Sequence, residues 1–182
     1  EKKYLVRCIE EGWVSSEGPF VAEFEESFAK FCGRKYGVAV SSGTAALEVA
    51  MGALGLKPGD EVIMPTFTII SCPLAVMQYG LTPVFVDADP ATWTIDVNKI
   101  EEKITSKTKA IMPVHLTGEP ADMDEILRIA KKRRLVVVED ACQAIGSRYK
   151  GRNTGTLGVA GGFSLHPLKN LNVWGDGGII TT

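Results

Sequence analysis

The sequence has no long apolar run and no strong excess of charge of either sign. No uninterrupted apolar stretch approaches the roughly 20 residues that a membrane-spanning helix needs. The 20 lysine and arginine residues nearly balance 22 acidic residues, which gives a formal net charge of −2. Nucleic acids and anionic membranes attract proteins that carry a strong basic surface. We therefore expect neither nucleic acid nor a membrane among the partners of this chain.

Cysteine and histidine are also scarce. The four cysteines, at positions 8, 32, 72 and 142, are far apart and show no C-x-x-C spacing. Only His115 and His166 could join them at a metal ion, so we expect no metal site. In a chain of 182 residues we expect the cysteines to be reduced, partly buried thiols of a cytoplasmic protein.

The sequence does contain a regular alternation of short β-branched runs with helical stretches. The predicted strands are residues 37–42, 61–65, 83–89, 109–116, 135–141, 161–165 and 177–182. The predicted helices are residues 21–33, 43–56, 72–80, 97–104 and 123–134. Strands that read as continuous apolar runs are typical of a parallel sheet covered by helices on both faces. We predict an α/β fold with a mostly parallel sheet of about seven strands, the last of which can run antiparallel.

Three stretches with chemically active side chains follow predicted strands, at the sheet edge where open α/β proteins bind ligands. The first is "SSGTAAL", residues 41–47. Gly43 allows the backbone to approach a ligand closely, and the free N–H groups of a helix start favour a phosphate, to which Thr44 would add a hydroxyl. The alternative is an ordinary Ser/Thr helix cap, which is the commoner arrangement.

The second stretch, "VVVEDACQA", places Asp140 directly after an apolar strand. Burying a carboxylate is costly unless a cation or a donor meets it, and a protonated pyridine nitrogen is such a partner. Gln143, three residues later, could donate to a phenolate oxygen. The alternative is that Asp140 caps the next helix and that Gln143 is exposed. The residues alone leave both interpretations open.

The third stretch, "FSLHPLKNLNVWGDGG", contains Ser164 and Lys169. Most lysines are solvated surface charges. An amine that is desolvated or lies near other charges, however, becomes nucleophilic and forms Schiff bases. A phosphate cradle, a buried acid and an amine together fit one cofactor, pyridoxal 5′-phosphate, whose phosphate, ring nitrogen and aldehyde need these partners. The combination predicts a single pocket.

These stretches, together with "GWVSSEGPFVAEFEESFAKFCG", "PVFVDADPATWTIDV" and "PVHLTGEPADMD", resemble the DegT/DnrJ/StrS family of pyridoxal-phosphate-dependent nucleotide-sugar aminotransferases. The resemblance runs from Gly12 to the end of the chain. It implies the fold type I scaffold of aspartate aminotransferase. It also implies glutamate as amino donor, a keto sugar on a nucleoside diphosphate as acceptor, and a homodimer with shared active sites.

The resemblance also implies a role for each matching residue. Lys169 would bind the cofactor as a Schiff base and then shuttle a proton between substrate and cofactor. Asp140 would keep the pyridine nitrogen protonated, and Gln143 would hydrogen-bond the ring hydroxyl. The phosphate would be held by Gly43, Thr44 and Ser164.

The chain departs from the family pattern at several positions. Ile69 stands where the family usually has an aromatic residue that stacks on the cofactor ring. Phe67, two residues earlier, would share its face in a strand-like segment. Thr117 stands where tyrosine is common, and Asp176 where glutamate is common. Trp174 occupies a position that is usually smaller, so we expect it to narrow the substrate mouth or to serve packing.

The loop "GWVSSEGPF" resembles the family's substrate-contacting segment, which makes Trp13, Ser15 and Ser16 candidates for sugar contacts. Simple docking of this loop onto the sheet is the alternative. His166 is a candidate for contact with cofactor or substrate, whereas we expect His115 to be a structural residue at a strand end. "PTFTIISC" resembles the perosamine synthase branch, which makes 4-amino-4,6-dideoxy sugars.

Two other functions stay open. A branch of the family has histidine in place of the catalytic lysine and dehydrates sugars, whereas Lys169 favours transamination. A non-catalytic regulator or truncated homologue is the other alternative. We expect residues 1–37 to form the N-terminal loop and helix of the large domain and residues 38–182 to form its cofactor-binding sheet. We expect the family's smaller C-terminal domain to be absent from this chain.

Overall fold

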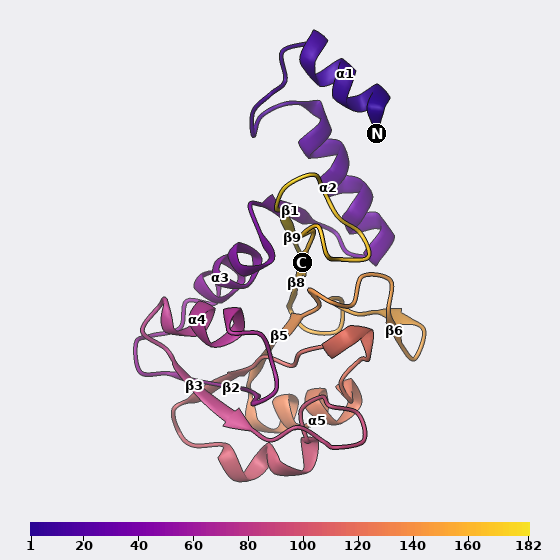
Figure 1. Ribbon diagram of the computed structural model, residues 1–182. Coiled ribbons are helices and arrows are strands. Elements are labelled where there is room, and N and C mark those ends of the chain that lie inside the picture. Colours follow the sequence, from indigo (N-terminus) through magenta and orange to yellow (C-terminus); the bar gives the residue numbers. More distant parts are fainter.

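A seven-stranded sheet lies at the centre of the computed structural model, which describes every residue from 1 to 182 (Figure 1). Its strands are β1 (Gly37–Val40), β2 (Glu61–Pro65), β3 (Thr82–Val86), β4 (Thr108–Ile111), β5 (Val136–Asp140), β8 (Ala160–Ser164) and β9 (Gly178–Thr181). Their order is β1-β9-β8-β5-β4-β2-β3. β9 runs antiparallel to both of its neighbours, and the strands from β8 to β3 are parallel. The predicted mostly parallel sheet of seven strands is confirmed, and its last strand is the antiparallel one.

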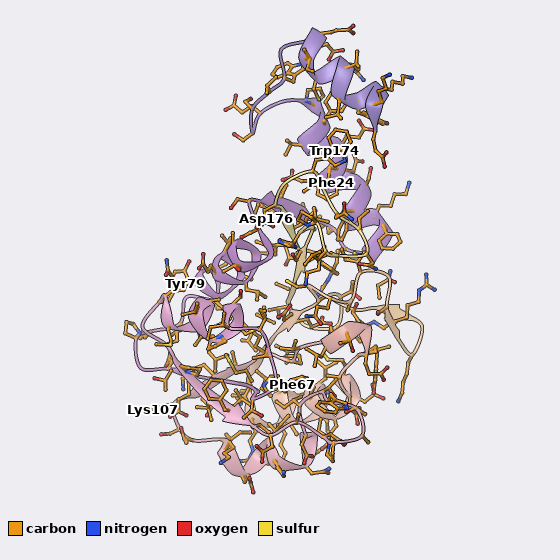
Figure 2. All side chains as sticks on the ribbon, in the orientation of Figure 1. Phe24, Phe67, Tyr79, Lys107, Trp174 and Asp176 are labelled. Carbon is orange, nitrogen blue, oxygen red and sulfur yellow. The ribbon has the colours of Figure 1, made fainter.

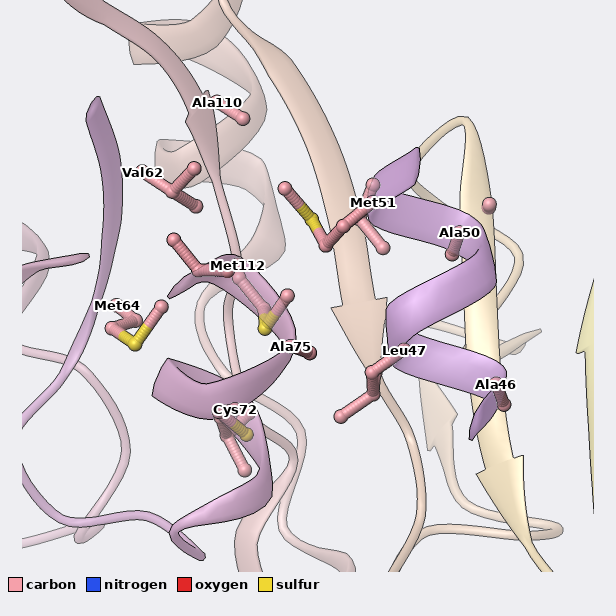
Figure 3. Packing of buried hydrophobic residues seen from close by; sticks show 14 of the residues in the cluster. Ala46, Leu47, Ala50, Met51, Val62, Met64, Cys72, Ala75, Ala110 and Met112 are labelled. Carbon is pink, nitrogen blue, oxygen red and sulfur yellow. The ribbon is translucent and has the colours of Figure 1, made fainter. Parts of the chain in front are cut away.

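Helices cover both faces of this sheet, and side chains fill the space between the layers (Figure 2). The helices are α1 (Lys2–Glu10), α2 (Pro19–Cys32), α3 (Gly43–Ala53), α4 (Ser71–Met77) and α5 (Met123–Arg133). On one face, Leu47 and Met51 of α3 and Cys72 of α4 pack with Met64 of β2 and with Met112, which directly follows β4 (Figure 3). The N-termini of α3 and α4 are thereby held beside each other.

Side-chain alternation along the strands produces a separate core on the other face. Val62 and Met64 of β2 belong to the cluster under α3 and α4, whereas Ile63 between them belongs to the cluster under α5. Successive side chains of a strand point to opposite faces, so one apolar run supplies both cores. α2 packs on this second face, where the ring of Phe28 meets that of Phe163 edge-on at 5.0 Å between centroids.

Two of the predicted elements differ from the structure. The predicted helix over residues 97–104 is wrong, because this segment forms two separate 3₁₀ turns, Val97–Lys99 and Glu101–Lys103. Ile100, between the turns, is fully buried, and so short a run does not offset the cost of nucleating an α-helix. β4 ends at Ile111, earlier than predicted, because Pro113 has no N–H group to continue the strand ladder.

The sequence pattern does not predict α1, which lies at the end of the molecule away from α5 (Figure 1). None of its residues is buried. It contacts α2 through the ring of Tyr4, which meets Phe20 edge-on at 5.4 Å between centroids. None of the helices combines the length and the apolar character that crossing a bilayer demands.

Glu139 of β5 is a fully buried carboxylate whose hydrogen bonds connect this strand to neighbouring turns. Its four donors are Leu157 N–H and Gly158 N–H at 2.6 Å, Gly155 N–H at 2.8 Å and His115 Nε2 at 2.9 Å. Nδ1 of His115 accepts from a backbone N–H at 3.2 Å, so Nε2 carries the proton. Burial raises the pKa of the Glu139 carboxyl, but the hydrogen bonds from His115 and the backbone outweigh burial and hold this pKa below its ordinary value. His115 is therefore a structural residue, as expected.

We expect Glu139→Gln to lower the free energy of unfolding by about 3 kcal/mol, because the amide replaces one acceptor oxygen with an NH₂ donor that faces N–H groups. The contribution of the ionised carboxylate is fully present above pH 4.5, the ordinary pKa of glutamate, and is lost as the pH falls through the lower folded-state pKa. The difference between variant and wild type should therefore shrink in acid. Urea unfolding measures both effects.

The exposed Glu102 provides the matched control. Glu102→Gln should change the free energy of unfolding by less than about 0.5 kcal/mol. Equal losses of unfolding free energy for the two variants near neutral pH would contradict the role assigned to Glu139.

Candidate functional site

The predicted site residues meet in one cavity of about 280 Å³ at the edge of the sheet where the parallel strands end. The predicted residues that line it are Gly43, Thr44, Ile69, Ser164, His166 and Lys169. Asp140 is buried directly behind the lining residue Cys142, whose backbone N–H donates to its carboxylate at 2.9 Å. The structure thus brings together the three stretches that the sequence singles out.

The N-terminus of α3 forms one wall of the cavity. Ser42 caps the helix, and its Oγ accepts from Ala45 N–H at 3.0 Å. The next two backbone N–H groups, of Gly43 and Thr44, donate to no acceptor within the chain. The stretch is therefore an N-cap and also offers two free donors at the positive end of a helix dipole, an arrangement that binds anions.

Gly43 stands where no side chain fits. A Cβ there would lie 2.6 Å from Ser164 Cβ and 3.0 Å from both Ser164 Oγ and Cys142 Sγ. The missing side chain lets the end of β8 approach the start of α3, so that the Ser164 hydroxyl and the free N–H groups line the same space. Ser164 Oγ also accepts from His166 N–H at 3.3 Å.

Asp140 ends β5 with only 2% of its surface exposed. Its Oδ1 accepts from Cys142 N–H and its Oδ2 accepts from the Cys72 thiol, each at 2.9 Å. An ionised carboxylate has about four acceptor positions, so two donors leave room for a further donor or cation. No helix follows Asp140, and the alternative in which it caps one is wrong.

Gln143 lies half-buried after β5 and does not line the cavity itself. Its Oε1 accepts from Thr117 N–H at 2.7 Å, which leaves Nε2 free to donate. Thr117 adopts a left-handed backbone with φ of 53°, which turns residues 116–118 back toward Gln143. The Gln143 side chain is thus held by the backbone N–H of Thr117, the residue that stands where the family commonly has tyrosine.

Lys169 lies on the loop after β8, half-buried, with its backbone N–H donating to His166 O at 2.8 Å. Its amine is not among the cations that form ion pairs within the chain. Burial raises the pKa of the Cys142 thiol, the charge of Asp140 raises it further, and the charge of Lys169 opposes them. The carboxylate and the amine therefore both lie close enough to influence one thiol at the cavity wall.

Ile69 occupies the rim of the cavity, 52% exposed. The expectation that Phe67 shares its face is wrong, because β2 ends at Pro65 and the following residues form a bend rather than a strand. Phe67 packs instead against Trp93, at 5.3 Å between ring centroids. The ring face that a bound ligand presents here would meet an aliphatic side chain.

The structure does not bring Trp13, Ser15, Ser16 or Trp174 to this cavity. Trp174 is 83% exposed and borders an apolar groove beside Phe24, between its own loop, α1 and α2 (Figure 2). It does not narrow the cavity within this chain. Trp13 packs its ring against Gly18, and Ser15 Oγ bonds to the backbone of Glu17.

Three residues of the site are not predicted from the sequence. Ser71 lines the cavity, and its hydroxyl oxygen lies 2.9 Å from that of Thr44. The thiol of Cys72 and the backbone N–H of Cys142 donate hydrogen bonds to Asp140. The signal that could have found Ser71 and Cys72 is their place just beyond the carboxyl end of β2, where ligand-binding side chains gather. No group of three or more His, Cys, Asp or Glu side chains is arranged to hold a metal ion.

Comparison with known proteins gives consistent matches over the chain. Residues 1–182 match the DegT/DnrJ/EryC1/StrS aminotransferase family. A protein of Caulobacter vibrioides named GDP-perosamine synthase is 47% identical over 182 residues, which are 100% of this chain and 49% of that protein. The chain thus spans about half the length of the curated relatives it matches.

Solved structures agree with the sequence matches. An aminotransferase from Psychrobacter cryohalolentis superposes with a TM-score of 0.93 at 40% identity, covering 100% of this chain and 46% of that one. NtdA from Bacillus subtilis, solved with bound cofactor PMP, gives a TM-score of 0.87 at 43% identity, covering 91% of this chain and 37% of that one. The predicted fold type is confirmed by these neighbours.

The buried thiols yield a test of the site geometry. Burial raises the pKa of Cys32 to about 11 and raises that of Cys142 as well, so little of either is thiolate near neutral pH. We expect iodoacetamide to label the partly exposed Cys8 at least roughly tenfold faster than either, as followed by mass spectrometry of digests. Rapid labelling of Cys142 in the folded chain would contradict the burial of its thiol in the cavity wall.

Proposed function

The chain belongs to the DegT/DnrJ/EryC1/StrS aminotransferase family, and we propose that it forms the cofactor-binding part of a nucleotide-sugar aminotransferase. The enzyme would use pyridoxal 5′-phosphate to move an amino group from glutamate to a keto sugar on a nucleoside diphosphate, giving an amino sugar of the perosamine type. One observation carries this proposal. A single cavity gathers free helix N–H groups and the Lys169 amine, with the buried Asp140 carboxylate behind its wall.

The residues present fit the polar parts of this cofactor. The free N–H groups of Gly43 and Thr44, with the Thr44 and Ser164 hydroxyls, would hold the phosphate. Asp140 would accept a hydrogen bond from the protonated ring nitrogen at its spare acceptor positions. Ile69 would cover one ring face by dispersion, and the free Gln143 Nε2 would donate to the ring hydroxyl.

Pyridoxal phosphate, when bound, supplies an electron sink and carries the amino group between the two substrates. Lys169 Nζ would bind its aldehyde and afterwards hold the proton that moves between substrate and cofactor. Asp140 would keep the proton on the ring nitrogen. His166, at the cavity wall, is placed to contact glutamate or the sugar.

We also propose that two copies of the chain form a homodimer with shared sites. Ile69, Ile70 and Leu168 are large apolar side chains that lie exposed at or beside the cavity, and exposed apolar surface of this kind favours association. In such a dimer Trp13, Ser15, Ser16 and Trp174, which lie away from the cavity of their own chain, would be free to contact the sugar at a shared site.

We also propose that the chain is located in the cytoplasm and that it divides at residue 37. All four cysteines are free, and free thiols persist in reducing compartments such as the cytoplasm. Residues 1–37 would serve as the N-terminal arm of the large domain and residues 38–182 as its cofactor-binding sheet.

We expect the chain to develop a visible absorption band with pyridoxal phosphate, and Lys169→Ala to abolish it. Lys107→Ala is the matched control, because Lys107 is exposed just before β4, at the opposite end of the parallel strands (Figure 2). Adding glutamate should bleach the band. A band that survives Lys169→Ala would contradict the role of Lys169, and a lysine-dependent band indifferent to glutamate would contradict transamination.

Gly43→Ala tests the phosphate wall. The added methyl group would meet Ser164 and Cys142 at 3.0 Å or less, so the start of α3 and the end of β8 must separate. We expect the Kd for pyridoxal phosphate, from titration of the band, to rise by about tenfold or more. Gly175→Ala, where a Cβ meets nothing within 4 Å, should leave it unchanged. Equal Kd values for the two variants would remove Gly43 from the site.

A further inference from the structure

The buried thiol of Cys72 bonds to the Asp140 carboxylate in a way that the proposed function does not assign. Cys72 is fully buried in the first turn of α4. Its Sγ donates to Asp140 Oδ2 at 2.9 Å and accepts from Thr68 Oγ1 at 3.0 Å. Hydroxyl, thiol and carboxylate thus form a directed chain of hydrogen bonds that ends on the carboxylate of the candidate site.

The same turn of α4 also contacts the start of α3 at the cavity. Ser71, directly before Cys72, has its Oγ 2.9 Å from Thr44 Oγ1 at the phosphate wall. Cys72 also packs in the core cluster that contains Leu47 of α3 (Figure 3). The start of α4 is therefore fixed against both the start of α3 and the end of β5.

The thiol is a permanent donor in this position. Burial raises the pKa of Cys72, and the charge of Asp140 raises it further, so the sulfur keeps its proton. The other titratable groups at this carboxylate are the Cys142 thiol, which lies 3.7 Å from Gly162 O, and Lys169, whose charge acts on Cys142. Charge-assisted hydrogen bonds to a buried carboxylate are stronger than neutral ones and fix its orientation.

We infer that Cys72 is a positioning residue whose S–H group holds Asp140 Oδ2, so that the carboxylate keeps one orientation toward the ring nitrogen of pyridoxal phosphate. This inference rests on the proposed function for its consequence, though not for the bond itself. Cys142 N–H fixes the other oxygen, so that loss of Cys72 would free the carboxylate to rotate about that remaining donor.

The bond is tested without cofactor by the infrared S–H stretch of the folded chain. We expect Cys72→Ala to remove a band at the low frequency of a hydrogen-bonded thiol. Asp140→Asn should shift this band to higher frequency, because a neutral amide oxygen is a weaker acceptor than a carboxylate. A Cys72 band that Asp140→Asn leaves in place would overturn the inference.

The effect of this thiol on cofactor binding is tested by titrating the chain with pyridoxal phosphate. Cys72→Ala should raise the Kd about tenfold, whereas Cys72→Ser, which keeps a donor, should bind within about twofold of wild type. Cys32→Ala is the matched control, since Cys32 is a buried thiol of a different core cluster and makes no side-chain hydrogen bond. Equal weakening by Cys72→Ala and Cys72→Ser, or by Cys32→Ala, would show packing alone and overturn the positioning role. A wild-type chain that binds no cofactor would contradict the proposed function, while the infrared result decides the bond independently.

Discussion

The candidate site depends on two adjacent carboxylates at the end of the central strand. Glu139 and Asp140 lie on opposite faces of the sheet, because successive side chains of a strand alternate. Glu139 receives four donors and is satisfied within the fold, whereas Asp140 receives two. A buried charge with acceptor positions to spare is costly, so we propose that Glu139 stabilises the fold and that Asp140 binds a further donor of a ligand.

The surrounding elements hold the backbone of Asp140 from both sides. Its N–H donates to Pro113 O at 2.9 Å and its carbonyl accepts from His115 N–H at 3.0 Å, while Ala141 N–H donates to Gly162 O of β8 at 2.9 Å. Residues 155–158, which donate to Glu139, pack closely against β8. A Cβ at Gly161 would lie only 2.3 Å from Gly155 Cα, so no side chain fits between them. The strand that ends in Ser164 and leads to Lys169 is therefore fixed relative to Asp140, and one cavity can serve three separated stretches of sequence.

The sequence predicts those features that depend on local pattern. Apolar runs of strand length define the sheet, and Gly43, Ser164 and Lys169 reach one cavity because Gly43 begins a helix after a strand, Ser164 ends a strand and Lys169 follows it. The predicted helix over residues 97–104 is wrong because so short a run does not offset the cost of nucleating an α-helix, and two 3₁₀ turns form instead. The donors to Glu139, and the contact of Cys72 with Asp140, come from turns and a helix start distant in sequence. Only tertiary packing brings them together, so pattern alone cannot reveal them.

We propose above all that Lys169 is the residue that binds pyridoxal phosphate in this cavity. The most direct measurement is borohydride reduction of the chain with the cofactor, which makes the lysine–cofactor bond permanent, followed by peptide mapping by mass spectrometry. We expect one dominant modified peptide, which carries the label on Lys169. Label spread over surface lysines such as Lys107 and Lys131, with none enriched at Lys169, would contradict it.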